Sequence, residues 1–243
     1  MGKLLVQDKD IVAPGDVLAT GMDYLPANGT FRAGDEIIAS QMGLVNLSGR
    51  LIKLIPLSGK YLPKEGDNVI GVIEDVSFNN WFVNIGAPFK AALSSKEIIP
   101  FSDRNADLTQ YYNFGDVIYA AVAKVTRSKI IDLTMRGHGF RKIVGGRFIE
   151  VSSSKVPRII GKQGSMISMV KEATECKITV GQNGKIWIKG ENTADEEIAI
   201  ETILKIEKQS HLDGLTEEIN SFLESKYKGK KIGGVKPAEA EEL

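Results

Sequence analysis

The chain has 243 residues with 31 basic and 31 acidic side chains, so its formal net charge at neutral pH is zero. Its single cysteine, Cys176, excludes an intrachain disulfide and any zinc ribbon built from cysteines of this chain. No apolar run approaches the roughly 18 residues of a membrane span, and the first residues lack a signal-peptide core. We therefore expect a cytoplasmic protein with no membrane partner.

The charges are unevenly distributed along the chain. Residues 137–190 carry ten basic and three acidic side chains, a local net charge of +7, whereas residues 191–243 carry seven and thirteen, a net of −6. Such a basic block suits a polyanion partner. It could equally be a solvated face that pairs with the acidic segment after it, and charge alone does not decide between the two.

Residues 1–62 are expected to form a small β domain. Turn residues followed by short apolar runs recur there, and Asn28-Gly29 is a strong hairpin-turn signal. We find no candidate site in this domain. Its apolar, charge-balanced composition suits packing against a partner protein.

Residues 63–138 predict a small closed barrel of the OB type. The stretch "GDNVIGVIEDVSFNNWFVNIGAPFKAALSSKEI" indicates three strands, and "FGDVIYAAVAKVTRSKIIDLTMRG" indicates two more. A long polar connection separates the two groups. Five strands arranged in this way are typical of OB barrels.

Residues 139–212 predict an α+β domain, which begins after a basic, glycine-containing hinge. The expected order is a strand, a short helix over Val156–Ile160, the loop "GKQG", a second helix from about Ser165, a hairpin turning at Asn183-Gly184, and a long helix. Residues 213–243 predict one more amphipathic helix, followed by a tail expected to be disordered.

The loop "GKQG" could bind a phosphate. A nucleotide-binding P-loop is excluded, because Gln163 follows Gly161-Lys162 where Ser or Thr is required after the Lys and Val156 occupies the position of the first glycine. A helix–loop–helix clamp is the better hypothesis, because the free N–H groups at the start of the second helix favour an anion. A plain tight turn between two helices is the alternative.

Residues 146–210, with "IIGKQGSMI" at the loop, resemble a KH domain of the first topological type. The resemblance implies a groove for about four single-stranded nucleotides. It implies a backbone clamp formed by Gly161, Lys162, Gln163 and Gly164. It also implies a groove lined by Arg158, Ile160 and Ile167.

Residues 64–136 resemble an S1 RNA-binding domain through "VSFNNWFVNIG". The resemblance implies that Phe78 and Phe82 stack on bases, and Trp81 is an additional candidate. We expect at least one of these three aromatics to belong to the core instead. The basic candidates near the binding face are Lys90, Arg127, Lys129 and Arg136. Ser94 stands where the S1 family often has a histidine. The resemblance is therefore a weaker guide to RNA-binding residues on the side of the barrel that holds Ser94.

The order of an N-terminal β domain, an S1 domain and one KH domain resembles the family of RNA-binding cap subunits of the archaeal exosome. That family implies three cap copies on a hexameric ring of RNase PH-like subunits. The N-terminal domain would dock on the ring, and the other domains would recruit single-stranded RNA, A-rich tails included, for 3′-to-5′ degradation and tailing. The alternative is an antitermination-type factor with S1 and KH domains that binds RNA polymerase.

No catalytic constellation is present in the sequence. The two histidines, His138 and His211, have no second His or Cys at metal-ligand spacing. We therefore expect a non-catalytic component without a metal or a cofactor.

Overall fold

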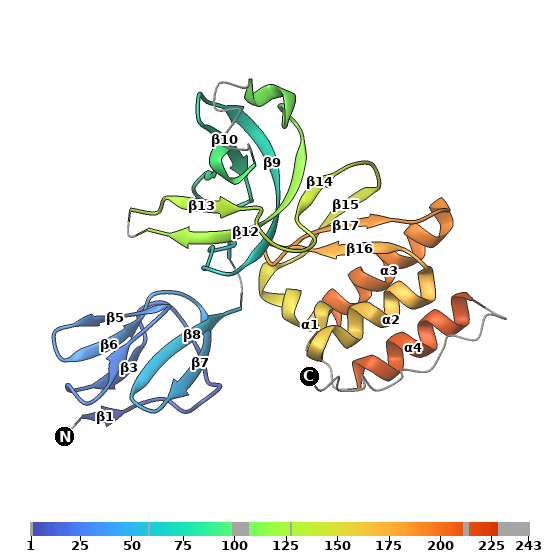
Figure 1. Cartoon of the computed structure of the whole chain (residues 1–243). Coiled ribbons are helices and arrows are strands. Elements are labelled where there is room, and N and C mark those ends of the chain that lie inside the picture. Colours follow the sequence, from blue (N-terminus) through green and yellow to red (C-terminus); the bar gives the residue numbers. More distant parts are fainter. Residues whose placement is uncertain (1, 58, 99–106, 127, 211–213, 228–243) are drawn as a thin grey trace, which may run out of the picture. The chain divides into compact units, whose positions relative to one another are not determined.

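The computed structural model describes residues 2–57, 59–98, 107–126, 128–210 and 214–227. It divides into two compact units, Met1–Gly59 and Lys60–Leu243, and each is described by itself (Figure 1). Arg127, His211 and the tail from residue 228 onward lie outside the described residues. Within the described ranges, no helix is long and apolar enough to cross a membrane.

The first unit consists of two small sheets that enclose one core. One sheet has the order β1-β3-β6-β5 and the other β2-β7-β8-β4. The strands are β1 (Lys3–Leu4), β2 (Ile11–Val12), β3 (Val17–Thr20), β4 (Leu25–Pro26), β5 (Thr30–Ala33), β6 (Glu36–Ala39), β7 (Gly43–Ser48) and β8 (Leu51–Pro56). Alternate residues of β8, Ile52 and Leu54, point into the core with Leu18 and Ile37.

The second unit begins with the predicted five-stranded barrel. Its strands run in the order β9-β10-β11-β13-β12, and β12 pairs back with β9 to close the barrel. Strands β11 and β13 are parallel neighbours, and the other pairs named here are antiparallel. The elements are β9 (Asn68–Val76), β10 (Asn80–Asn84), β11 (Ala91–Ser94), η1 (Ser95–Glu97), η3 (Leu108–Gln110), β12 (Val117–Val125) and β13 (Ile131–Thr134). The strand order and closure confirm the OB-type prediction.

A short strand, β14 (Arg141–Ile143), extends the barrel sheet beside β12 and leads into the α+β domain. That domain has an antiparallel sheet in the order β15-β17-β16. Its elements are β15 (Arg147–Glu150), η4 (Ser153–Lys155), α1 (Val156–Ile160), η5 (Lys162–Gly164), α2 (Ser165–Thr174), β16 (Lys177–Val180), β17 (Lys185–Lys189) and α3 (Thr193–Lys208). The order of strand, two helices, hairpin and helix is the one predicted.

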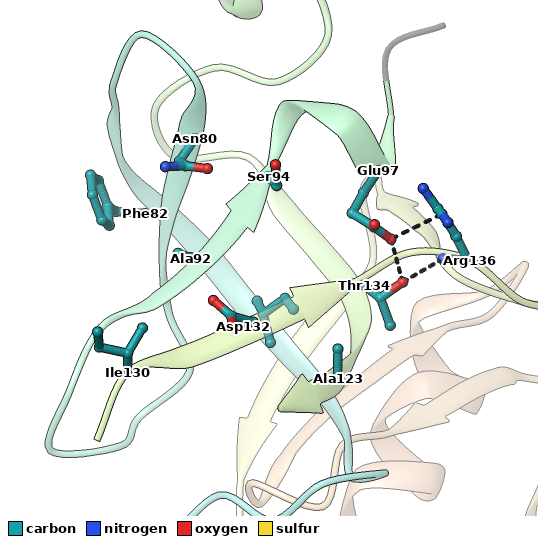
Figure 2. A pocket seen from close by; sticks show the side chains of 11 residues that line it. Asn80, Phe82, Ala92, Ser94, Glu97, Ala123, Ile130, Asp132, Thr134 and Arg136 are labelled. Carbon is teal, nitrogen blue, oxygen red and sulfur yellow. Dashed lines mark hydrogen bonds and ion pairs between the residues drawn. The ribbon is translucent and has the colours of Figure 1, made fainter. Parts of the chain in front are cut away.

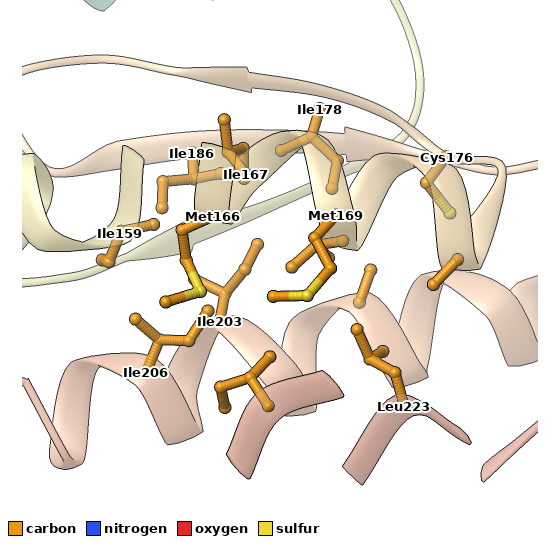
Figure 3. Packing of buried hydrophobic residues seen from close by; sticks show 14 of the residues in the cluster. Ile159, Met166, Ile167, Met169, Cys176, Ile178, Ile186, Ile203, Ile206 and Leu223 are labelled. Carbon is orange, nitrogen blue, oxygen red and sulfur yellow. The ribbon is translucent and has the colours of Figure 1, made fainter. Parts of the chain in front are cut away.

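The helices of the α+β domain share one apolar core with its sheet. Figure 3 shows Ile159 of α1, Met166 of α2 and Ile203 of α3 beneath the strand residues Ile178 and Ile186. The last helix, α4 (Leu215–Lys226), joins the same core through three fully buried side chains: Leu215, Ile219 and Leu223. This helix is therefore an integral layer of the domain.

Candidate nucleic-acid interface

The loop between α1 and α2 has an irregular backbone that positions its side chains outward. Gly161 has φ 77° and ψ 177°, and Gly164 has φ 80° and ψ 8°. Gln163 also lies in the left-handed region with φ 51°, which is uncommon for a residue with a side chain. Gly161 ends α1 with a positive φ and an extended ψ, outside the left-handed helical region.

The two glycines of this loop are required for different reasons. A Cβ on Gly161 would lie 2.7 Å from Met166 Cβ and 2.8 Å from the Met166 backbone nitrogen. This glycine is therefore needed by the packing of α2 inside the protein. A Cβ on Gly164 would meet no atom within 4 Å. Gly164 thus leaves open surface, and it is the glycine that a ligand backbone could approach.

The predicted clamp and groove residues differ in exposure. Lys162, Gln163 and Arg158 are exposed, and Ile160 is partly buried. Ile167 is only 7% exposed and belongs to the core cluster. Its side chain therefore offers little surface to a base.

The electrostatics of the loop favour an anion. Gly164 is the N-cap of the ten-residue helix α2, and no side chain caps the helix there. The Ser165 N–H, the first of α2, donates to the Lys162 carbonyl, and the helix dipole adds positive potential at this end of the helix. Among the described residues, Lys162 makes no ion pair. The acidic segment pairs with the basic block at Arg147, which contacts Glu196 at 3.3 Å and Glu197 at 3.5 Å.

A second candidate surface is a hollow of about 530 Å³ on the barrel (Figure 2). It lies over β10, β11 and β13, the strand region with which OB barrels bind oligonucleotides. Its lining combines one half-buried aromatic ring with polar and small side chains: Asn80, Phe82, Ala92, Ser94, Glu97, Ala123, Ile130, Asp132, Leu133, Thr134 and Arg136.

The structure separates the three predicted aromatics. Phe82 lines the hollow, and Phe78, in the turn before β10, is 88% exposed. Trp81 is completely buried and donates its indole N–H to the Tyr112 carbonyl at 3.0 Å. Trp81 therefore cannot stack on a base, and the prediction for it is corrected. The reason is strand alternation, since Trp81 and Val83 point inward while Asn80 and Phe82 point outward.

The predicted basic residues of the barrel do not form one cluster. Lys90 pairs with Glu74 at 3.2 Å, and it does not line the hollow. Hydrogen bonds from Asn84 and Lys90 hold the pKa of Glu74 below its ordinary value. Lys129 is exposed in the turn before β13 and has φ 64°.

Of the predicted cations, Arg136 lines the hollow, at the opposite end from Phe82 (Figure 2). Its guanidinium lies 3.4 Å from Glu97, whose carboxylate also accepts the Thr134 hydroxyl (Figure 2). This network holds Arg136 at the rim of the hollow, and 72% of its side chain is exposed to solvent. Sequence reasoning missed Asn80, Asp132 and Thr134. All three lie at positions of β10 and β13 whose side chains alternate outward, and this alternation is the signal that could have identified them.

The described part of the chain offers no metal site. It contains no group of three or more His, Cys, Asp or Glu side chains placed to hold an ion. His138 is exposed in the hinge. The two candidate surfaces offer exposed cations and an aromatic ring.

Comparison with known proteins agrees with this geometry. A KH-domain family model matches residues 146–194, which confirms the KH resemblance. Across 97% of this chain and 90% of the relative, the sequence is 45% identical to the exosome complex component Rrp4 of Pyrococcus abyssi. The chain belongs to the Rrp4 family of exosome components.

Other members of the family support the same assignment. The Rrp4 protein of Thermococcus kodakarensis is 42% identical over 97% of this chain and 93% of that protein. A solved structure of a protein assigned to the exosome as an RNA-binding protein is 38% identical, with a TM-score of 0.63. It matches over 70% of this chain and 98% of its own.

Proposed function

We propose that this Rrp4-family chain is the RNA-binding cap subunit of an exosome. The observation that carries the proposal is the KH loop, with open space at Gly164 and an exposed Lys162 at the start of α2. This loop lies in a chain that is 45% identical to an exosome component over nearly its whole length. Backbone N–H groups at a helix start suit a phosphodiester, and KH loops clamp the backbone of about four nucleotides.

The barrel supplies the second contact with the same class of ligand. Phe82 offers a ring on which a base can stack, and Arg136 offers a positive charge at the rim of the hollow. A stacked base contributes about 1–3 kcal/mol and is tolerant of sequence. Single-stranded RNA is the ligand that fits a stacking surface and a backbone clamp, and we propose that A-rich tails are among the RNAs bound.

The first unit is proposed to dock on the RNase PH-like ring, with three caps per ring. The outer face of its β2-β7-β8-β4 sheet carries apolar side chains on either side of the polar pair Asn46 and Lys53: Ile11, Leu44 and Ile55 form one cross-strand row, and Leu25 pairs with Leu51. Ile11 is 67% exposed and Ile55 is 48% exposed. An apolar sheet face of this kind favours a protein partner.

Catalysis is assigned to the ring, and this chain acts as a non-catalytic adaptor of 3′-to-5′ degradation and tailing in the cytoplasm. The antitermination-type alternative is not favoured, because the curated relatives matched at 37–45% identity are exosome components.

The test combines RNA binding with assembly. Fluorescence anisotropy of the purified chain with a labelled 20-nucleotide RNA should show binding that weakens steeply as salt rises, without shortening of the RNA. Native mass spectrometry with co-expressed ring subunits should show three copies per hexamer. Degradation by the isolated chain, or co-purification with RNA polymerase instead of a ring, would contradict the proposal.

The docking face can be tested separately from RNA binding. Ile11→Glu with Ile55→Glu should abolish assembly with the ring, because two charges would be buried in an apolar contact, and should leave RNA affinity unchanged. Phe31→Glu is a matched control: Phe31 is 47% exposed on β5 of the opposite sheet. Equal loss of assembly in control and double variant would refute the assignment of this face.

A further inference from the structure

The sheet of the KH domain, β15-β17-β16, has one face against helices and one face turned away from them. Ile178 and Ile186 point toward the helices and belong to the apolar core (Figure 3). Side chains of neighbouring strand residues point to opposite faces, so the residues between them form a second face, here called the outer sheet face. The outer sheet face consists of Lys177 and Thr179 of β16, Lys185, Trp187 and Lys189 of β17, and Phe148 and Glu150 of β15.

Two lysines stand directly opposite each other at one end of the outer sheet face. The register pairs Lys177 with Lys189, and both side chains are exposed. Like charges at opposed positions of an antiparallel pair, with Cβ atoms about 5 Å apart, destabilise a sheet. Among the described residues neither lysine forms an ion pair, and Lys189 Nζ donates to the Val144 carbonyl at 3.4 Å. An anion bound between the two ammonium groups would relieve their repulsion.

A third cation reaches the neighbouring row of the same face. The guanidinium carbon of Arg141 lies 5.6 Å from the centre of the Trp187 ring, and its Nη2 lies 3.5 Å from Thr179 Oγ1. Thr179 and Trp187 form the row about 7 Å along the strands from the lysines. Arg141 is exposed, and its Nη1 donates to Gly139 O at 3.1 Å. A guanidinium has five N–H donors, so donors remain for a phosphate.

An exposed aromatic ring lies in the same row as Arg141. Phe148 of β15 pairs with Trp187 and is 46% exposed, whereas Trp187 is buried. Phe148 is therefore the ring of this face that a ligand can reach. In the row beyond it, Glu150 is opposite Lys185, so that row adds no net charge.

The structure divides the basic block of residues 137–190 into two groups. Lys142 pairs with Asp116, and Arg147 contacts the acidic segment, so these two cations are used inside the protein. The three cations of the outer sheet face and its border have no acidic partner among the described residues. They lie together beside the exposed ring.

We infer that the outer sheet face is a further RNA-binding surface, where Lys177, Lys189 and Arg141 bind phosphates of a single strand and Phe148 stacks on a base. This inference rests on the proposed function and extends it to a third surface, since the KH loop belongs to the helices on the opposite side of the sheet. Cations without acidic partners suit a polyanion. A reachable ring among them suits single-stranded nucleic acid, because every base offers a face for stacking.

Lys177→Glu tests the inference, because it should change stability and RNA affinity in opposite directions. It turns the like-charge pair with Lys189 into an opposite-charge pair, so the melting temperature should rise by about 1–3 °C. Anisotropy of the full chain with a labelled 20-nucleotide oligo(A) should show affinity about tenfold weaker at low salt. The slope of log affinity against log salt should become shallower by about 0.7 for the phosphate lost. Phe148→Ala should weaken binding about fivefold without changing that slope.

Two further variants serve as controls. Lys208→Glu makes the same change in net charge at an exposed position in the last turn of α3, among the helices on the other side of the sheet. It should change RNA affinity by less than about twofold, because charge at that distance is screened. Lys177→Glu combined with Lys189→Glu restores a like-charge pair, so the melting temperature should return to the wild-type value while RNA affinity falls further.

Three results would overturn the inference. Equal RNA affinity in Lys177→Glu and Lys208→Glu would mean that RNA does not contact this face. Unchanged RNA affinity in Lys177→Glu, with loss of ring assembly in native mass spectrometry, would assign the face to an acidic protein partner instead. A fall of melting temperature together with RNA affinity would give Lys177 a role in folding only.

Failure of the proposed function would look different from failure of this inference. In that case the wild-type chain would bind no RNA, whereas the higher melting temperature of Lys177→Glu, measured without RNA, would persist.

Discussion

Gly164→Asp should separate RNA binding from folding at the KH loop. The new side chain meets open space, so its folding cost is the left-handed backbone alone, about 1 kcal/mol for a residue that tolerates this region. For a unit of this size the melting temperature should fall by about 2–4 °C. A carboxylate about 5 Å from a bound phosphate repels it by about 1–3 kcal/mol. RNA affinity should therefore fall about tenfold.

The chain contains a closely matched control for this substitution. Gly214 is the N-cap of α4, with φ 74° and ψ 8°, and a Cβ there also meets no atom within 4 Å. Gly214→Asp therefore introduces the same charge and the same backbone strain at another helix start. It should lower the melting temperature equally and leave RNA affinity unchanged.

Anisotropy titrations of both variants across a range of salt concentrations test the reasoning. In Gly164→Asp the slope of log affinity against log salt should become shallower by about 0.7 for each phosphate that the variant no longer binds. Equal affinity for RNA in the two variants would refute a phosphate-binding role for this loop. Gly161→Ala is unsuitable as a probe, because its Cβ would clash with Met166 and destabilise the fold by about 2–4 kcal/mol.

Three further predictions concern the barrel and the KH core. Trp81→Ala should destabilise the fold by about 3–5 kcal/mol, seen by urea denaturation, with normal RNA affinity for the molecules that remain folded. Phe82→Ala should weaken RNA binding by about 1–3 kcal/mol with a much smaller effect on unfolding; the reverse pattern would place Phe82 in the core. Burial raises the pKa of the Cys176 thiol, so the thiol ionises more readily after unfolding, and the free energy of unfolding should decrease as pH rises above about 8.5. Cys176→Ala should flatten that decrease between about pH 8 and pH 10 in urea denaturation, and an unchanged profile would contradict the assignment.

The KH domain was predictable because its signals are local. The spacing of apolar residues around "GKQG" indicated α1 and α2 with the same boundaries that the structure has, Val156–Ile160 and a start at Ser165. Short-range periodicity is sufficient where helix, loop and helix are consecutive in the chain. The same signals could not distinguish the roles of Gly161 and Gly164, since that depends on where Met166 packs.

The barrel was predictable as a set of strands, but its binding face was not. The sequence "NNWFVN" shows two adjacent aromatics, Trp81 and Phe82, that must point to opposite faces of a strand. Which face is the interior depends on barrel closure by β12 and β13, far along the chain. Closure buries Trp81 and leaves Phe82 at the hollow.

The sequence by itself determined the strand and helix order, the KH loop and the membership of a family, because these follow from local spacing and overall similarity. Only the tertiary structure decided which glycine faces a ligand, which aromatic is free, and which cations of the basic block have acidic partners. Those properties arise from contacts between residues distant in sequence, such as Arg147 with Glu196, which no local pattern encodes.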